Sequence, residues 1–249
     1  MSNQLTYSIG LQVCRPNKLS HILQSLKTMM FQETFKIPLH IVVDRRSTEI
    51  ENILDKYEVE CSFTNGIGNW TSKNVLLELF MRDNTDYVLL FEDDVHFHNF
   101  RCLYVMKSAY NVCRQFIGFY KLNSEDCLKT FARDFQGKIV INNIDFYTFS
   151  TINTSALLLI DRKAIKTIGF FFNSYYENGF YDYRDRMKRS GLVGDLLMPC
   201  DIERCFSVDD SIPSTISRED REIYKKQMLP PAEDNWRPYC VEPAFVLKK

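Results

Sequence analysis

The first ninety residues alternate between short apolar runs and longer amphipathic runs. The apolar runs have strand character and cover 7–13, 37–43, 59–63 and 87–91. Helical spacing of apolar side chains separates them, over 19–31, from the capping residue Ser47 onwards, and over 71–81. The run 87–91 carries no charge, which is typical of a strand covered on both faces. Strands that alternate with helices predict an α/β fold with a mainly parallel sheet and helices on both faces.

After residue 100 the pattern changes. The expected elements are, in order, a helix over 101–116, a meander of short segments over 116–149, a strand over 154–160, a helix over 161–168 and a charged helix ending near Gly191. The basic segment 184–189 of this last helix is expected to be a solvated face. After Asp209 the chain is rich in Ser, Pro and charge and is expected to wrap the domain as a tail.

Composition narrows the class of protein. The 249 residues include 31 basic and 32 acidic side chains, and a net charge of −1 does not favour a general nucleic-acid or membrane-surface binder. No apolar run approaches the ~20 residues of a membrane span, and no signal peptide is recognisable. The eight cysteines include no Cys-x-x-Cys pair, so reduced thiols are expected. These features predict a cytoplasmic protein.

Three successive carboxylates, Glu92, Asp93 and Asp94, directly follow the uncharged strand. Ligands of open α/β sheets bind at the carboxyl ends of strands. Buried together without a partner, the carboxylates cost several kcal/mol per ion. Mg²⁺ or Mn²⁺ would relieve their repulsion, because such a cation prefers one or two carboxylates plus phosphate oxygens. A solvated acidic turn is the alternative.

Asp44 ends the second strand and is expected at the same edge of the sheet. Its carboxylate can accept hydrogen bonds from a base imide or a ribose hydroxyl, while Arg45 and Arg46 can face phosphates. The alternative is a helix-capping Asp beside solvated arginines.

Taken in order, these segments resemble the family 2 glycosyltransferases and their GT-A relatives, over roughly residues 7–198. The matching segments are Leu11 to Asn17 with its Pro16, Asp44 to Thr48, Ser72-Lys73-Asn74, the DxD-like Glu92-Asp93-Asp94, Leu157 to Phe171, and Gly179 to Gly191. The resemblance implies a single GT-A domain, a Rossmann-like fold. In it, 1–100 would bind the donor, 101–206 would bind the acceptor and carry catalysis, and 207–249 would form the tail.

The resemblance also implies roles for individual residues. Asp44 would hold the nucleotide base, Lys73 would reach the base or the diphosphate, and Asp94 would be the principal metal ligand. Asp93 would assist at the metal and, with Glu92, contact the donor. Further donor-binding residues are expected in the loop after the first strand and after Asp44: Gln12, Cys14, Arg15 and Arg45.

The chain departs from the family at the catalytic base, because the usual Glu-Asp pair falls on Gly179 and Phe180. We expect Asp182 to be the base, with Glu177 as second choice. If Asp182 is only an exposed carboxylate at a helix start, the enzyme is retaining or inactive. Inversion is favoured, because many retaining relatives use a C-terminal His on the metal and no His follows residue 98.

The predicted function is metal-dependent transfer of a sugar from a nucleotide-sugar, expected to be a UDP-sugar, to an acceptor hydroxyl. A glycan is the favoured acceptor, with a protein or a modified nucleic acid as alternatives. One competing function is an inactive GT-A-like module that binds a carbohydrate or a protein. Another is a sugar-phosphate nucleotidyltransferase, which the absence of Gly from Cys14 to Asn17 disfavours.

Overall fold

The computed structural model describes residues 6–30, 37–43, 46–64, 69–98, 101–113, 116–119, 124–150, 157–171, 183, 186–187, 189–192 and 196–208. Four predicted site residues lie outside this set: Asp44, Arg45, Glu177 and Asp182. So do residues 172–182 and the tail after Asp209.

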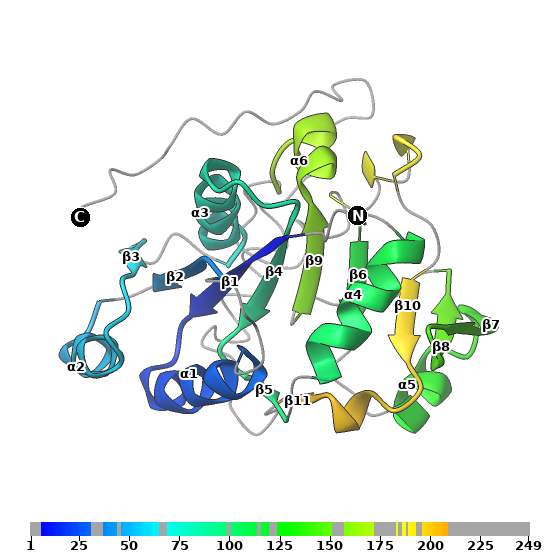
Figure 1. Ribbon diagram of the computed structural model, residues 1–249, viewed down its shortest axis with the longest axis horizontal. Helices are drawn as coiled ribbons and strands as arrows, with labels where there is room; N and C mark the ends of the chain where they lie inside the picture. The colour runs from blue at the N-terminus through cyan, green and yellow to red at the C-terminus, as the bar shows by residue number, and fades with distance from the viewer. Residues whose placement is uncertain are drawn as a thin grey trace, which may run out of the picture.

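A six-stranded sheet with the order β3-β2-β1-β4-β9-β6 forms the centre of the molecule (Figure 1). Its strands are β1 (Tyr7–Val13), β2 (Leu39–Val43), β3 (Ser62–Phe63), β4 (Tyr87–Glu92), β6 (Phe116–Phe119) and β9 (Leu157–Asp161). The first four strands along the chain are parallel. Only β9 runs against its neighbours β4 and β6. The prediction of a mainly parallel α/β sheet is therefore confirmed.

Strands β1 and β4 lie at the centre of this sheet, and every residue of β1 is buried. Gly10 allows their close approach, because a Cβ at this position would lie 2.6 Å from Leu90 Cδ2 and 3.4 Å from Leu76 Cβ. The buried apolar side chains of the sheet and its helices join into one continuous core, as expected of a single domain.

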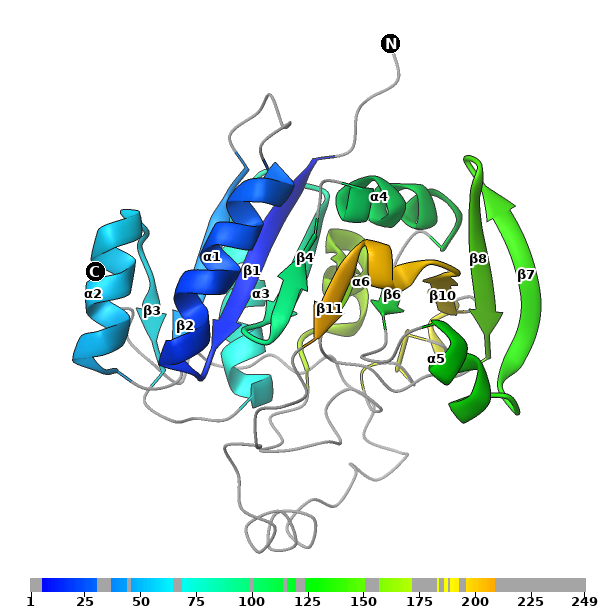
Figure 2. The ribbon, with the colours of Figure 1, turned by 90° about the horizontal axis from the view of Figure 1, so that it is seen from below.

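The helices that pack around this sheet are α1 (Pro16–Met30), α2 (Thr48–Tyr57), α3 (Asn69–Arg82), α4 (Arg101–Cys113) and α6 (Arg162–Ile168), while α5 (Ser124–Thr130) lies away from it, near β8 (Figure 2). Helices α1 and α3 lie on opposite faces of β1 and β2 (Figures 1 and 2). Ser47 caps α2 as predicted, since its Oγ accepts a hydrogen bond from the Ile50 amide at 3.2 Å. No helix among the described residues is both long and apolar enough to span a membrane.

A second, antiparallel sheet consists of β7 (Phe135–Ile141), β8 (Ile144–Phe149) and β10 (Leu196–Pro199). It lies at the opposite end of the molecule from α2 and β3 (Figure 2). Asn142 and Asn143 make the tight turn between β7 and β8, both at positive φ, which asparagine tolerates well. The predicted meander is thus confirmed in this hairpin, whereas α5 was not predicted.

A small two-stranded ribbon extends β4 beyond the sheet. Strand β5 (Val95–Phe97) pairs with β11 (Phe206–Val208), which follows the short helix η1 (Ile202–Arg204). Asp93 and Asp94 form the turn between β4 and β5. The acidic triplet therefore lies at the carboxyl end of β4, as the sequence predicts.

Candidate functional site at the carboxyl ends of β1 and β4

The candidate site lies where the adjacent strands β1 and β4 end. Gln12 of β1 is paired in register with Glu92 of β4. The chain continues from β1 into the loop of Cys14 and Arg15, and from β4 into the turn of Asp93 and Asp94. The parallel order of the two strands thus brings together residues about eighty positions apart.

Asp93 joins these two segments. Its Oδ2 accepts hydrogen bonds from the amides of Cys14 at 2.6 Å and Arg15 at 2.5 Å. Its Oδ1 accepts from the Arg15 guanidinium, from Nε at 2.8 Å and from Nη2 at 2.5 Å. An ionised carboxylate has about four acceptor positions, and these four donors fill them. Asp93 is therefore a clamp between the loop after β1 and the turn after β4.

Asp94 and Glu92 each lie beside a cation. Nη2 of Arg15 is 3.2 Å from Asp94 Oδ2, and the Asp94 side chain is 3% exposed. Nζ of Lys73 is 2.7 Å from Glu92 Oε1, and the Lys73 side chain is completely buried. The Lys73 ammonium also lies 4.8 Å from the centre of the Trp70 ring, a favourable cation–π distance.

The chain thus supplies its own counter-charges to the acidic triplet. Three carboxylates face the guanidinium of Arg15 and the ammonium of Lys73, which leaves one net negative charge. The repulsion that the sequence suggested a metal would relieve is already largely relieved. Neither pairing has a local sequence signal, because Arg15 is 78 positions from Asp93 and Lys73 is 19 from Glu92.

The burial of this cluster shifts its pKa values. Burial raises the pKa of Asp93 above its usual value, and the hydrogen bonds from Arg15 and the two amides oppose that rise. Burial by itself would lower the pKa of Arg15, but its hydrogen bonds and attraction to Asp93, and its attraction to Asp94, raise it. Arg15 therefore stays charged, and its guanidinium opposes the rise in the pKa of Asp93 that burial causes.

Few described side chains are available as ligands for a divalent cation. Among the described residues, no three His, Cys, Asp or Glu side chains converge to hold a metal ion. Asp93 has its acceptor positions filled, and Glu92 is paired with Lys73. Asp94 remains as a single carboxylate ligand, which fits Mg²⁺ or Mn²⁺ taking its other ligands from a diphosphate and water.

Gln12 places a buried acceptor in the same site. The residue is 2% exposed, and no described residue donates a hydrogen bond to its Oε1. Its Nε2 lies 3.9 Å from the Cys14 sulfur. A buried carbonyl oxygen without a hydrogen-bond donor is energetically unfavourable, so a ligand N–H or O–H that donates to it would stabilise the complex.

The structure also explains residues whose roles the sequence left open. Asn74 of α3 clamps Phe171, donating to its carbonyl at 2.9 Å and accepting from its amide at 2.8 Å. Arg186 is 3% exposed and donates to the carbonyls of Ile168 and Phe170. The prediction that 184–189 is a solvated face is therefore wrong for Arg186, because these carbonyls and the ring of Tyr183 surround its guanidinium.

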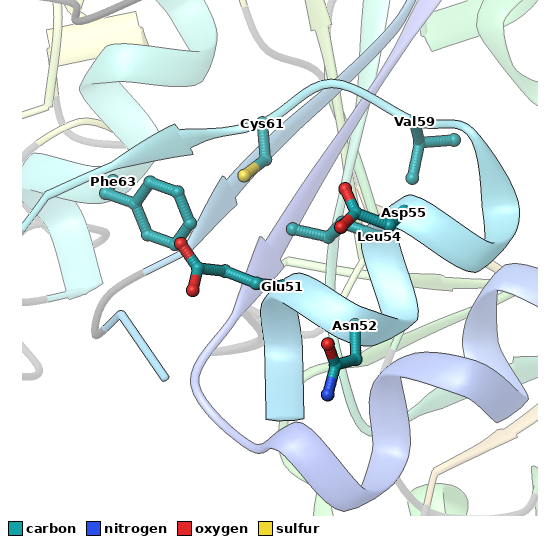
Figure 3. Close-up of a pocket in the computed structure, with 7 residues that line it drawn as sticks. All are labelled: Glu51, Asn52, Leu54, Asp55, Val59, Cys61 and Phe63. Carbon is teal, nitrogen blue, oxygen red and sulfur yellow. The ribbon is translucent and has the colours of Figure 1, made fainter. Parts of the chain in front are cut away.

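A separate open pocket of about 410 Å³ lies between α2 and β3 (Figure 3). Seven residues line it: Glu51, Asn52, Leu54, Asp55, Val59, Cys61 and Phe63. Burial, followed by repulsion from Glu51, raises the pKa of Cys61 to about 11. None of these residues was predicted to belong to the site.

The fold is shared with solved glycosyltransferase structures. S. aureus TarS 1–349 in complex with UDP superimposes with a TM-score of 0.58 at 17% identity, over 88% of this chain and 63% of that one. The mannosyltransferase PcManGT of Pyrobaculum calidifontis, in complex with GDP-Man and Mn²⁺, gives 0.56 at 11% identity, over 88% and 61%. Drosophila β1,4-galactosyltransferase 7, in complex with manganese, UDP-Gal and xylobiose, gives 0.51 at 15%, over 93% and 84%.

These similarities define the class of fold. The chain has the GT-A fold of glycosyltransferases, as its sequence resemblance implied. It spans less than two-thirds of the TarS and PcManGT chains that it matches. No protein-family model and no curated protein matches the sequence.

Proposed function

We propose that this protein is a glycosyltransferase that takes a sugar from a nucleotide-sugar, with UDP as the expected nucleotide, and transfers it to an acceptor hydroxyl. One observation carries the proposal. A buried acidic turn and a buried glutamine oxygen lie together at the carboxyl ends of β1 and β4, in a GT-A fold. Ligands of open α/β sheets bind at this edge.

The donor would be held mainly by the first hundred residues. Gln12 offers its buried Oε1 to an N–H of the base or a hydroxyl of the ribose. Asp44 and Arg45, which follow β2, are proposed to complete the base and phosphate contacts. Cys14 and Arg15 shape the loop that borders the donor, and Lys73 acts by orienting Glu92 rather than by direct contact, because its side chain is buried.

Asp94 is proposed to hold Mn²⁺ or Mg²⁺. When bound, the cation neutralises charge that develops on the departing diphosphate. Asp93 keeps the turn attached to the loop after β1, so that Asp94 stays at the edge of the sheet. The role of Asp93 is then to position Asp94, and not to act as a second metal ligand.

The acceptor side is proposed to come from 101–206, with 207–249 as a tail. Asp182 is the proposed base for an inverting transfer, and Glu177 is the second candidate. Each must come within hydrogen-bond reach of the acceptor hydroxyl to take its proton. The acceptor is proposed to be a glycan.

A second candidate function is a GT-A-like binding module without catalysis. Arg15 and Lys73 already neutralise two of the three carboxylates, so keeping the acidic turn does not by itself require a metal. This observation removes the objection that an acidic cluster without a metal is unstable.

Release of nucleoside diphosphate from a panel of nucleotide-sugars, with Mn²⁺ and without an added acceptor, separates the two functions. We expect slow, metal-dependent hydrolysis of at least one UDP-sugar by the wild type and its loss in Asp94→Asn. Asp55→Asn, an exposed position on α2, is the matched control and should retain the activity. Binding of a nucleotide-sugar without turnover under all metal conditions would favour the binding module.

A further inference from the structure

Arg15 contacts two of the three carboxylates at once. Its Nη2 lies 2.5 Å from Asp93 Oδ1 and 3.2 Å from Asp94 Oδ2, and its Nε holds Asp93 independently at 2.8 Å. The side chain is 17% exposed, so the pair is largely shielded from water. The only acidic side chain of the turn that fits a metal is thus already beside a protein cation.

We infer that Arg15 competes with the divalent cation for Asp94 and thereby makes metal binding depend on the nucleotide diphosphate. The inference rests on the proposed function, and it assigns to Arg15 a regulatory role at the donor site. A metal ion that approaches Asp94 alone meets the fixed positive charge of the guanidinium on Oδ2, and the two cations compete for the charge of one carboxylate. Metal alone is therefore expected to bind weakly.

A diphosphate changes this balance. Its negative charge would attract both the metal ion and the guanidinium of Arg15, which can bind phosphate oxygens through its planar fork. The contact of Arg15 with Asp94 is the longest of its carboxylate contacts, at 3.2 Å, and it can be lost while Nε stays bonded to Asp93. Arg15 can therefore release Asp94 without leaving the clamp.

The same geometry predicts which substitutions leave the site intact. Asp93 is also held by the amides of Cys14 and Arg15, and these bonds do not need the guanidinium. Arg15→Gln removes the charge and keeps the backbone bonds. Arg15→Lys keeps the charge but loses the fork. Lys129→Gln, at an exposed position on α5, removes one charge elsewhere and is the matched control.

The test is Mn²⁺ binding followed by the electron paramagnetic resonance signal of free Mn²⁺, with and without UDP, against blanks of UDP alone. For the wild type we expect UDP to tighten Mn²⁺ binding at least about tenfold. Arg15→Gln should bind Mn²⁺ without UDP about tenfold more tightly than the wild type, as expected when one charged hydrogen-bond competitor is lost. Arg15→Lys and Lys129→Gln should stay near the wild type.

Thermal unfolding checks that each variant is folded. If Arg15→Gln is not folded, Arg15→Met, which keeps the apolar part of the side chain, takes its place. An unchanged or weaker Mn²⁺ affinity of the charge-removing variant without UDP would overturn the role of Arg15, while UDP-dependent Mn²⁺ binding by the wild type would leave the proposed function standing. If the wild type binds neither UDP nor Mn²⁺ with UDP, both the proposed function and the inference fail.

Discussion

The ion pair of Lys73 with Glu92 gives the sharpest stability prediction. The Lys73 side chain is completely buried and that of Glu92 is 15% exposed, with the charged atoms 2.7 Å apart. Methionine has a similar volume to both residues, so Lys73→Met and Glu92→Met each remove one charge and keep most of the packing. Removing one partner of a buried pair costs about 3–5 kcal/mol, because the other charge stays buried.

The two single variants should differ in how much they lower the free energy of unfolding. Lys73→Met leaves a carboxylate that retains some contact with water, so we expect a loss of about 3 kcal/mol in the free energy of unfolding. Glu92→Met leaves the fully buried ammonium without this carboxylate, and the loss should approach 5 kcal/mol. The double variant removes both charges and should be more stable than either single variant, because apolar replacement of a buried pair is often close to neutral.

Urea unfolding of the four proteins measures this cycle. A parallel cycle on Glu125 and Lys129, an exposed pair on α5, is the control and should give a coupling close to zero. Additive losses in the double variant of Lys73 and Glu92 would refute the argument that the two charges stabilise one another.

Three further predictions concern the fold. Gly10→Ala should lower the free energy of unfolding by about 1–3 kcal/mol, because the new methyl group meets Leu90 in the core. In urea unfolding, Gly10→Ala should cost less in a Leu90→Ala background, where the clashing Cδ2 is absent. Arg162 donates to four carbonyls at the end of α3, so Arg162→Met should cost about 3 kcal/mol and increase hydrogen exchange there. Burial, with Asp201 nearby, raises the pKa of Cys205 to about 11, so stability should fall as pH rises from 9 to 11, by up to about 3 kcal/mol.

The sign of the pH effect follows from the order of ionisation. The unfolded thiol ionises first, near its ordinary pKa of 9, so the unfolded state releases protons before the folded state does. Cys205→Ala should make the decline measured by urea unfolding between pH 8 and pH 11 less steep without abolishing it, because burial also raises the pKa of Cys61 and Cys102. An equally steep decline in this variant would contradict the assignment.

A Gly10→Ala protein as stable as the wild type would contradict the packing argument at Gly10. Unchanged hydrogen exchange at the end of α3 in Arg162→Met would contradict the stabilising role given to Arg162 there.

The sequence was sufficient for the elements that have a strong local pattern. The strands β1, β2 and β4 stand out as short apolar runs, the helices α1 to α3 have apolar side chains at helical spacing, and Ser47 caps α2 as expected. The antiparallel direction of β9 has no local signature. The three-residue strand β5 could not be predicted either, because its partner β11 lies more than one hundred positions away.

The candidate site divides in the same way. That carboxylates follow β4 could be read from the sequence, because the end of an apolar strand fixes their place at the edge of the sheet. The cations that neutralise these carboxylates could not be predicted from the sequence, because the pairings of Arg15 and Lys73 arise only when β1, α3 and β4 pack together. Arg15 was expected to face the donor, and the structure places its guanidinium on Asp93 and Asp94.

The most direct test of the donor site is calorimetric titration of UDP into the wild type and Asp94→Ala, with and without Mn²⁺. We predict that UDP binds the wild type with Mn²⁺, binds more weakly without it, and loses the metal-dependent gain in Asp94→Ala. Binding of UDP that is unaffected by Mn²⁺ and by Asp94→Ala would contradict a metal-assisted site at this turn. No binding of UDP, GDP or the deoxythymidine analogue under either condition would contradict a nucleotide-sugar donor altogether.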